Sequence, residues 1–129
     1  LGSTASSAAG IVGGDSAAEA TLDLVSFDLA KPGTDMDILG SVKTENGRRF
    51  SSLSWGTLGI DTGVYPYGIL AGGLQEGMIN LWNPHAIVNS RGADQGLILS
   101  TQVHKGNVNC VELHPTKPNL MATCGADGE

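Results

Sequence analysis

Two histidines and two cysteines near the end of the sequence are the residues whose types could hold a metal ion: His104, Cys110, His114 and Cys124. Imidazole and thiolate are ligands that suit tetrahedral Zn²⁺. Their spacing does not fit a zinc finger, because the sequence contains no Cys-x-x-Cys pair. We therefore expect no metal site, and we expect both cysteines to be buried free thiols in a reducing environment.

Two short motifs suggest an enzyme, but the rest of the sequence supports neither. Ile11–Gly14 reads IVGG, which resembles the N-terminus of activated trypsin-like proteases, yet ten residues precede it and no Gly-Asp-Ser-Gly-Gly motif occurs. The glycines of AGGLQEG, residues 71–77, lack the Gly-Lys-Ser/Thr of a phosphate-binding loop. We therefore expect no enzyme, no catalytic residues, no cofactor and no small-molecule substrate.

The charge of the chain argues against polyanionic partners. Lys and Arg number 7 against 13 Asp and Glu, so the net charge is −6. Nucleic acids and anionic lipids both require a basic surface, so neither is an expected ligand. We interpret four acidic residues as solvated loop charges: Asp35, Asp37, Glu45 and Asp61.

Membrane and export signals are not expected either. No stretch approaches the ~20 apolar residues of a transmembrane helix. The N-terminal LGSTASSAAGIVGG has neither a starting Met nor a basic region, so we expect an interior fragment rather than a signal peptide.

The elements that position these residues are predicted to be short strands. The chain has 19 glycines among 129 residues and only 5% aromatic residues. Abundant glycine with few segments of helical periodicity is typical of many strands joined by turns. The composition therefore favours an all-β fold.

Internal repetition supports this interpretation. FSSLSWG, residues 50–56, and VNCVELH, residues 108–114, carry apolar residues with the same gaps of three and two, at a shift of 58 residues. Aligning Glu76-Gly77 on Asp127-Gly128 gives a shift of 51, and the difference lies in one loop, where length changes are tolerated. Each unit is interpreted as strand, turn, strand, tight turn and strand, with a linking segment that pairs beyond it and contains a strand over Leu97–Val103.

A third copy lies upstream. TLDLVSFDL, residues 21–29, matches MINLWNP, residues 78–84, with Val25 in the position of Trp82. We therefore divide the chain into a blade remnant at 1–29, a second repeat at 41–84 and a third at 97–129, all within one domain. Asp127-Gly128 predicts a hairpin turn, and we expect the third repeat to be truncated before its last strand.

The third repeat, HKGNVNCVELHPTKPNLMATCGADGE, resembles a WD40 repeat. This resemblance implies a partial WD40 β-propeller of about two and a half blades. It also implies that His104, Thr123 and Asp127 form a buried hydrogen-bond chain, whose partner Trp is missing here. The second repeat departs from the pattern, since it has no His-Gly entry, Gly72 replaces the hydroxyl residue, and Glu76 replaces Asp.

Longer strings resemble the N-terminal propeller of the large subunit of the COPII outer coat, above all GILAGGLQEGMINLWNP together with VHKGNVNCVELHPTKPNLMATCGADGE. The resemblance implies a non-enzymatic scaffold in endoplasmic reticulum to Golgi transport, on the cytosolic face of exit sites and vesicles. It implies contacts with the smaller WD40 coat subunit and other coat propellers, and no direct membrane insertion. A WD40 substrate-recognition adaptor in ubiquitin ligation or signalling remains the alternative.

Two further expectations follow from this organisation. GVYPYG, residues 63–68, is either a contact patch or a packed corner of the long loop. Because a blade obtains much of its burial from its neighbours, we also expect poor stability of the 129-residue piece alone.

Overall fold

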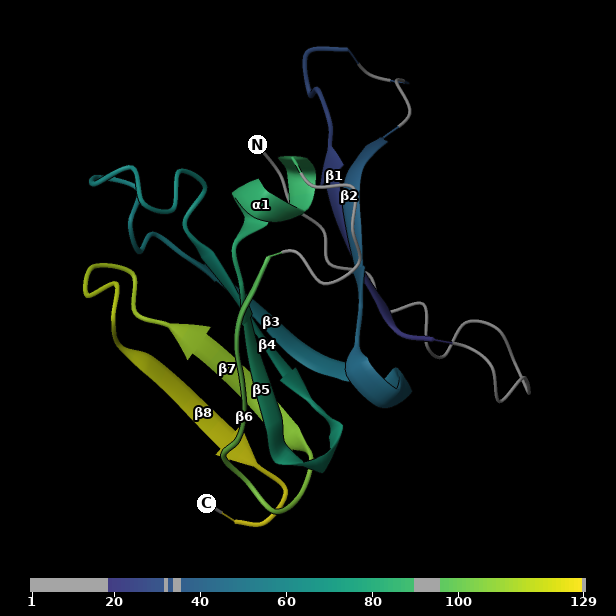
Figure 1. The fold of residues 1–129 in the computed structure, drawn as a ribbon, viewed down its shortest axis with the longest axis vertical. Helices are drawn as coiled ribbons and strands as arrows, with labels where there is room; N and C mark the ends of the chain where they lie inside the picture. Colours follow the sequence, from purple (N-terminus) through teal and green to yellow (C-terminus); the bar gives the residue numbers. More distant parts are fainter. Residues whose placement is uncertain (1–18, 32, 34–35, 90–95, 129) are drawn as a thin grey trace.

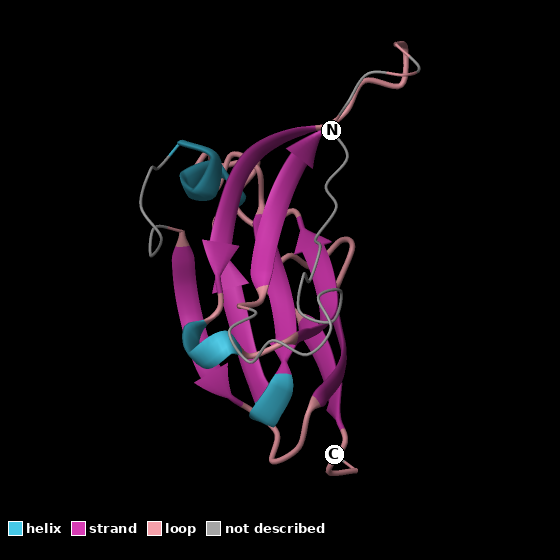
Figure 2. Ribbon diagram, turned by 90° about the vertical axis from the view of Figure 1, so that its right-hand side faces the viewer, coloured by secondary structure: helices cyan, strands magenta, loops and turns pink. Residues whose placement is uncertain are grey.

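A computed structural model describes residues 19–31, 33, 36–89 and 96–128. The strands of this part of the chain form three antiparallel sheets that lie one against the next (Figures 1 and 2). The IVGG motif, Asp35 and most of the expected first strand and loop lie outside the described residues. No helix in the described ranges is both long and apolar enough to cross a membrane.

Each sheet is built from strands that follow one another in the sequence. The first sheet pairs β1 with β2, the second has the order β3-β4-β5-β6, and the third pairs β7 with β8. The strands are β1 (Thr21–Ser26), β2 (Asp37–Lys43), β3 (Phe50–Gly56), β4 (Ile69–Leu74), β5 (Met78–Trp82), β6 (Leu97–Gln102), β7 (Val108–Leu113) and β8 (Met121–Gly125). Short helical turns are η1 (Glu45–Gly47), η2 (Gln75–Gly77) and α1 (Pro84–Asn89).

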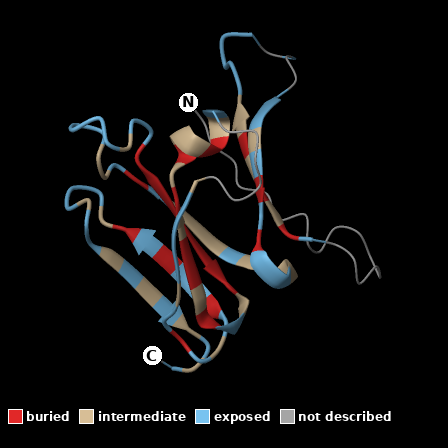
Figure 3. Ribbon diagram, viewed as in Figure 1, coloured by how far each residue is buried: buried red, intermediate tan, exposed pale blue. Residues whose placement is uncertain are grey.

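The four-stranded sheet is covered on both faces, and the core lies there (Figure 3). Every residue of β4 is buried, as its continuous apolar sequence ILAGGL predicts for a strand packed on both sides. Successive side chains point to opposite faces of a strand. One face therefore packs Leu70, Leu74 and Trp82 against the first sheet, and the other packs Ile69, Ala71 and Ile79 against β7.

Two adjacent glycines in β4 make room for both neighbours. A Cβ atom on Gly72 would lie 2.7 Å from Cζ3 of Trp82, and one on Gly73 would lie 2.5 Å from Cγ1 of Val108. Gly72, which departs from the repeat pattern in the sequence, is therefore the residue that leaves room for the indole of Trp82 in the first interface. The replacement of a hydroxyl residue has a steric reason.

The linking segment differs from the expectation in two respects. The strand expected over Leu97–Val103 is present as β6, but it pairs with β5 of its own sheet and not with the following unit. The loop expected before it contains the helix α1. Pro84 opens this helix, where the missing N–H of proline does no harm, and Ile87 buries it against the first sheet.

The expectation of buried cysteines was wrong. Cys110 and Cys124 are both free and exposed, and they lie opposite each other in β7 and β8. Alternation along β7 turns Val111 and Leu113 toward the second sheet, and Val108 also packs there because the strand is irregular between Val108 and Cys110. Cys110 therefore points to the other face of the hairpin.

Candidate functional site

His104, Cys110, His114 and Cys124, whose types could bind zinc, are not brought together as one group in the described part of the chain. Among the residues that the structure describes, no group of three or more His, Cys, Asp or Glu side chains could hold a metal ion. The polar side chains instead concentrate where one sheet passes to the next. We therefore take these junctions as the candidate functional site, since they determine how the sheets are oriented.

His104, Thr123 and Asp127 lie together at the junction between the second and third sheets. The imidazole of His104 is 5% exposed. Its Nε2 lies 3.0 Å from Oγ1 of Thr123, and its Nδ1 lies 3.3 Å from Oδ1 of Asp127. The other carboxylate oxygen, Oδ2, accepts a hydrogen bond from the backbone N–H of Lys105 at 2.7 Å.

Both ring nitrogens of the imidazole therefore face polar side chains. The Thr123 hydroxyl lies within hydrogen-bond distance of Nε2, and the Asp127 carboxylate faces Nδ1. The backbone N–H of Ala126 also donates to the carbonyl of Asn107 at 2.8 Å. The segment between β6 and β7 is thereby bonded to the turn that follows β8.

Thr44 occupies the corresponding place at the junction between the first and second sheets. It is buried, its N–H donates to the carbonyl of Ala20 at 3.0 Å, and its hydroxyl donates to the carbonyl of Arg48 at 2.6 Å. The N–H of His104 contacts the carbonyl of Gly77 in the same way, at 3.3 Å. Ala20 directly precedes β1 and Gly77 directly precedes β5, so Thr44 and His104 occupy equivalent positions after the strands that pair with β1 and β5.

The Thr44 junction was missed by sequence reasoning, although a signal for it existed. The alignment of residues 21–29 on 78–84 places Ala20 on Gly77. Thr44 directly follows β2, but the His-Gly pair that marks this position in a WD40 repeat is absent there.

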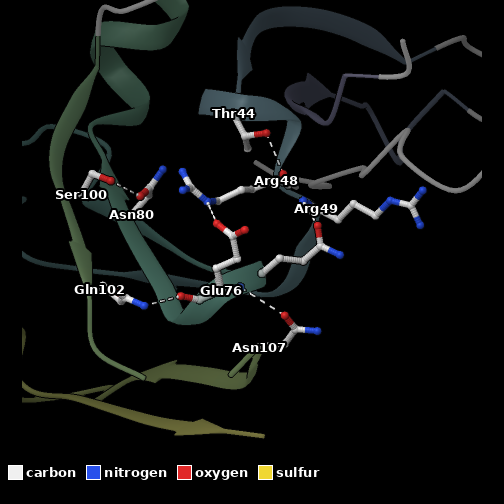
Figure 4. Close-up of polar contacts among 9 residues, drawn as sticks. Thr44, Arg48, Arg49, Glu76, Asn80, Ser100, Gln102 and Asn107 are labelled. Atoms are coloured by element: carbon white, nitrogen blue, oxygen red, sulfur yellow. Dashed lines mark hydrogen bonds and ion pairs between the residues drawn. The ribbon is translucent and has the colours of Figure 1, made fainter. Parts of the chain in front are cut away.

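Glu76 joins three segments of the chain at the β4–β5 turn (Figure 4). Its Oε2 accepts from Nε of Arg48 at 2.7 Å, and its backbone N–H donates to Oδ1 of Asn107 at 3.1 Å. Its carbonyl accepts from Nε2 of Gln102 at 3.0 Å. Glutamate stands at this position where the repeat pattern expects aspartate, and its side chain reaches Arg48 in the segment between β2 and β3.

Backbone-directed bonds reinforce the same turn (Figure 4). The N–H of Arg49 donates to Oε1 of Gln75 at 3.2 Å, and the N–H of Gln75 donates to the carbonyl of Arg49 at 3.1 Å. On the outer side of the sheet, the hydroxyl of Ser100 donates to Oδ1 of Asn80 at 2.7 Å. The β4–β5 turn is thus bonded to Arg49, the residue before β3, and a side-chain hydrogen bond joins β6 to β5.

Serine side chains of β3 form a second contact that sequence reasoning missed. The N–H of Val111 donates to Oγ of Ser52 at 3.0 Å, and the N–H of Leu113 donates to Oγ of Ser54 at 2.9 Å. The hydroxyl of Ser51 donates to the carbonyl of Val108. These hydroxyls pair with the edge of β7 that β8 leaves unpaired, and they fix the register of the two sheets.

The two tyrosines of the long loop at 57–68 have different surroundings. Tyr65 packs against the cluster between the second and third sheets, as a packed corner would. Tyr67 is exposed, and its ring meets that of His85 with the centroids 5.0 Å apart.

Comparison with curated proteins extends over nearly the whole chain, whereas no protein-family model matches the sequence. The chain is 32% identical to protein transport protein SEC31 homolog B of Arabidopsis thaliana, over 94% of this chain and 11% of that protein. It is 32% identical to protein transport protein SEC31 of Dictyostelium discoideum, over 93% of this chain and 9% of that protein. The resemblance predicted from the sequence is confirmed, and the chain spans about a tenth of the length of the curated relatives it matches.

Solved structures share the fold. One chain of "COPII on membranes, outer coat vertex" aligns with a TM-score of 0.59 at 21% identity, over 89% of this chain and 26% of that chain. The β-propeller domain of Myceliophteria thermophila Cps50 (Swd1) aligns with a TM-score of 0.58 at 12% identity, over 84% of this chain and 31% of that domain. The predicted fold, a partial β-propeller, is therefore confirmed.

Proposed function

We propose that this chain is part of the propeller of a structural component of the COPII coat that acts in transport from the endoplasmic reticulum to the Golgi. The observation that carries the proposal is the match to SEC31 transport proteins over 93–94% of the chain, on a backbone with the fold of a propeller. The same matches favour this role over that of a ubiquitin-ligase or signalling adaptor. The proposed role requires no catalytic step.

The mechanism is geometric. Sheets fixed to one another by the His104 and Thr44 junctions and by the β3 serines form a stiff unit that presents its loops at set positions. Individually weak contacts between such units add through effective concentration once several are linked in one coat. The proposed partners are the smaller WD40 subunit of the coat and other coat propellers.

The proposed place of action is the cytosolic face of exit sites and coated vesicles. The net charge of −6 supports an indirect contact with the membrane, because an acidic surface is repelled by anionic lipids. The segment would therefore lie in an outer protein layer.

Replacement of the natural protein in cells tests this function. We expect Trp82→Ala to remove the protein from the coat and to delay exit of secretory cargo from the endoplasmic reticulum, because Trp82 is 1% exposed in the core. Leu29→Ala, at an 85% exposed position, is the matched control and should leave both unchanged. Normal cargo exit after depletion of the protein would refute the proposal.

A further inference from the structure

A groove opens at one end of the molecule, between the first sheet and the loop 57–68. It has a volume of about 480 Å³. Figure 1 shows this loop, α1 and the β1–β2 sheet at the same end. The walls include Val25, Leu39, Trp55, Ile60, Tyr67 and Val88.

The side chains of the groove are apolar yet open to solvent. Trp55 is 40% exposed, Ile60 43% and Tyr67 41%. Large apolar side chains that gather in one concave site, rather than standing singly, mark a binding surface. The groove is therefore distinct from the ordinary scatter of exposed apolar residues.

The walls are held in place before anything binds. Nε1 of Trp55 donates to the carbonyl of Tyr67 at 2.6 Å, and the ring of Tyr67 meets that of His85 edge to face. The N–H of Tyr65 donates to the carbonyl of Gly59 at 3.2 Å, which closes the loop on itself. A site with fixed walls loses little conformational entropy on binding.

The charged residues that neighbour the groove-lining residues in the sequence all have one sign. Within two positions of a lining residue, the charged side chains are Asp23, Asp37 and Asp61, and none is Lys or Arg. Complementary charge on a partner favours encounter and fixes its register. A second copy of this chain would bring net negative charge to the same place, so the charge disfavours self-association.

We propose that this groove binds a short extended segment of a partner protein, which inserts aliphatic side chains between Trp55, Ile60 and Leu39 and places a Lys or Arg beside Asp61. Trp55 is partly exposed, and a cation placed over its ring is also attracted by the π system. The proposal rests on the groove alone and does not depend on the proposed coat function.

Binding of synthetic peptides to the full-length natural protein tests the proposal. The probe is a fluorescein-labelled six-residue peptide with two central leucines flanked by lysines, and its affinity is measured by fluorescence anisotropy. Two sibling peptides carry glutamate in place of lysine, or serine in place of leucine. We expect the first peptide to bind and each sibling to bind at least ~10-fold more weakly.

Paired variants locate the site. Ile60→Ser should weaken binding about tenfold, because Ile60 lines the groove. Val64→Ser is the matched control, since Val64 lies in the same loop, is 65% exposed and does not line the groove. Asp61→Asn should weaken binding of the lysine peptide and should not weaken binding of the glutamate peptide, which carries no lysine.

Three results would overturn the proposal. They are equal effects of Ile60→Ser and Val64→Ser, equal affinities of the lysine and glutamate peptides, or self-association that Ile60→Ser abolishes. None of these bears on cargo exit, which tests the coat function separately.

Discussion

The Thr123 hydroxyl is the only hydrogen-bond partner that the structure gives to Nε2 of His104 within the described residues. We predict that Thr123→Val destabilises the turn after β8 by about 1 to 3 kcal/mol, because it leaves a buried ring nitrogen without a partner. Hydrogen–deuterium exchange of the segment around Lys105 measures this as faster opening. Thr101→Val, a half-buried strand position, is the control and should leave that segment unchanged.

The β3 serines lead to a more local prediction. We expect Ser52→Ala to cost about 1 to 2 kcal/mol in local opening, since the N–H of Val111 then loses its acceptor. NMR-detected amide exchange should show faster exchange at Val111 and an unchanged rate at Leu113, which bonds to Ser54. Ser54→Ala should reverse the pattern. Equal acceleration at both amides would mean that the serines act only on global stability.

At the scale of residues, the sequence predicted contacts where a repeat motif exists and did not predict them elsewhere. The convergence of His104, Thr123 and Asp127 could be anticipated from a resemblance, but their role in fixing the turn stays a proposal. The Ser52 and Ser54 contacts could not be anticipated. They depend on the register between two sheets, and each serine is 59 residues away in the sequence from the residue it bonds. The exposure of Cys110 follows from the alternation along β7, which the assumption of a buried thiol disregarded.

At the scale of elements, the turns are held by glycines whose surroundings differ. Gly47 and Gly77 both have positive φ, at 65° and 75°. A Cβ atom on Gly47 would meet nothing within 4 Å, whereas one on Gly77 would lie 1.7 Å from the carbonyl oxygen of His104. A side chain at Gly47 would therefore introduce conformational strain alone, whereas a side chain at Gly77 would add a steric clash.

We predict that Gly47→Ala costs about 1 to 2 kcal/mol, from the left-handed conformation alone. Gly77→Ala should cost at least ~2 kcal/mol more, because β6 and the following linker must move away from the turn. Pulse proteolysis in urea compares the two variants directly. Similar losses of stability in the two variants would show that the segment at His104 moves away from the turn at little energetic cost.

The strands were largely predictable and their partners less so. The positions of β3, β4, β5, β7 and β8 follow from the apolar pattern and the two alignments. That β6 pairs with β5 does not, since an exposed strand carries no apolar alternation that would specify its neighbour. The helix α1 is short, and its stability comes from Ile87 in the first interface rather than from its own sequence.

For the molecule as a whole, burial is shared between sheets. The first and third sheets have two strands each among the described residues, and each covers one face of the second. Exposed apolar residues remain on β2 and β6, among them Ile38 and Leu99. We therefore predict that the isolated 129-residue chain unfolds over a broad urea range with a low midpoint. A sharp transition at high urea, measured by circular dichroism on a monomer, would contradict this.

A density map of outer coats reconstituted on membranes with the full-length natural protein tests the account most directly. We expect the three sheets to fit the map in succession as neighbouring blades of one ring in the outer layer, with β3 and β7 side by side. A coat that assembles without the protein, or a map in which these sheets are not adjacent, would contradict it.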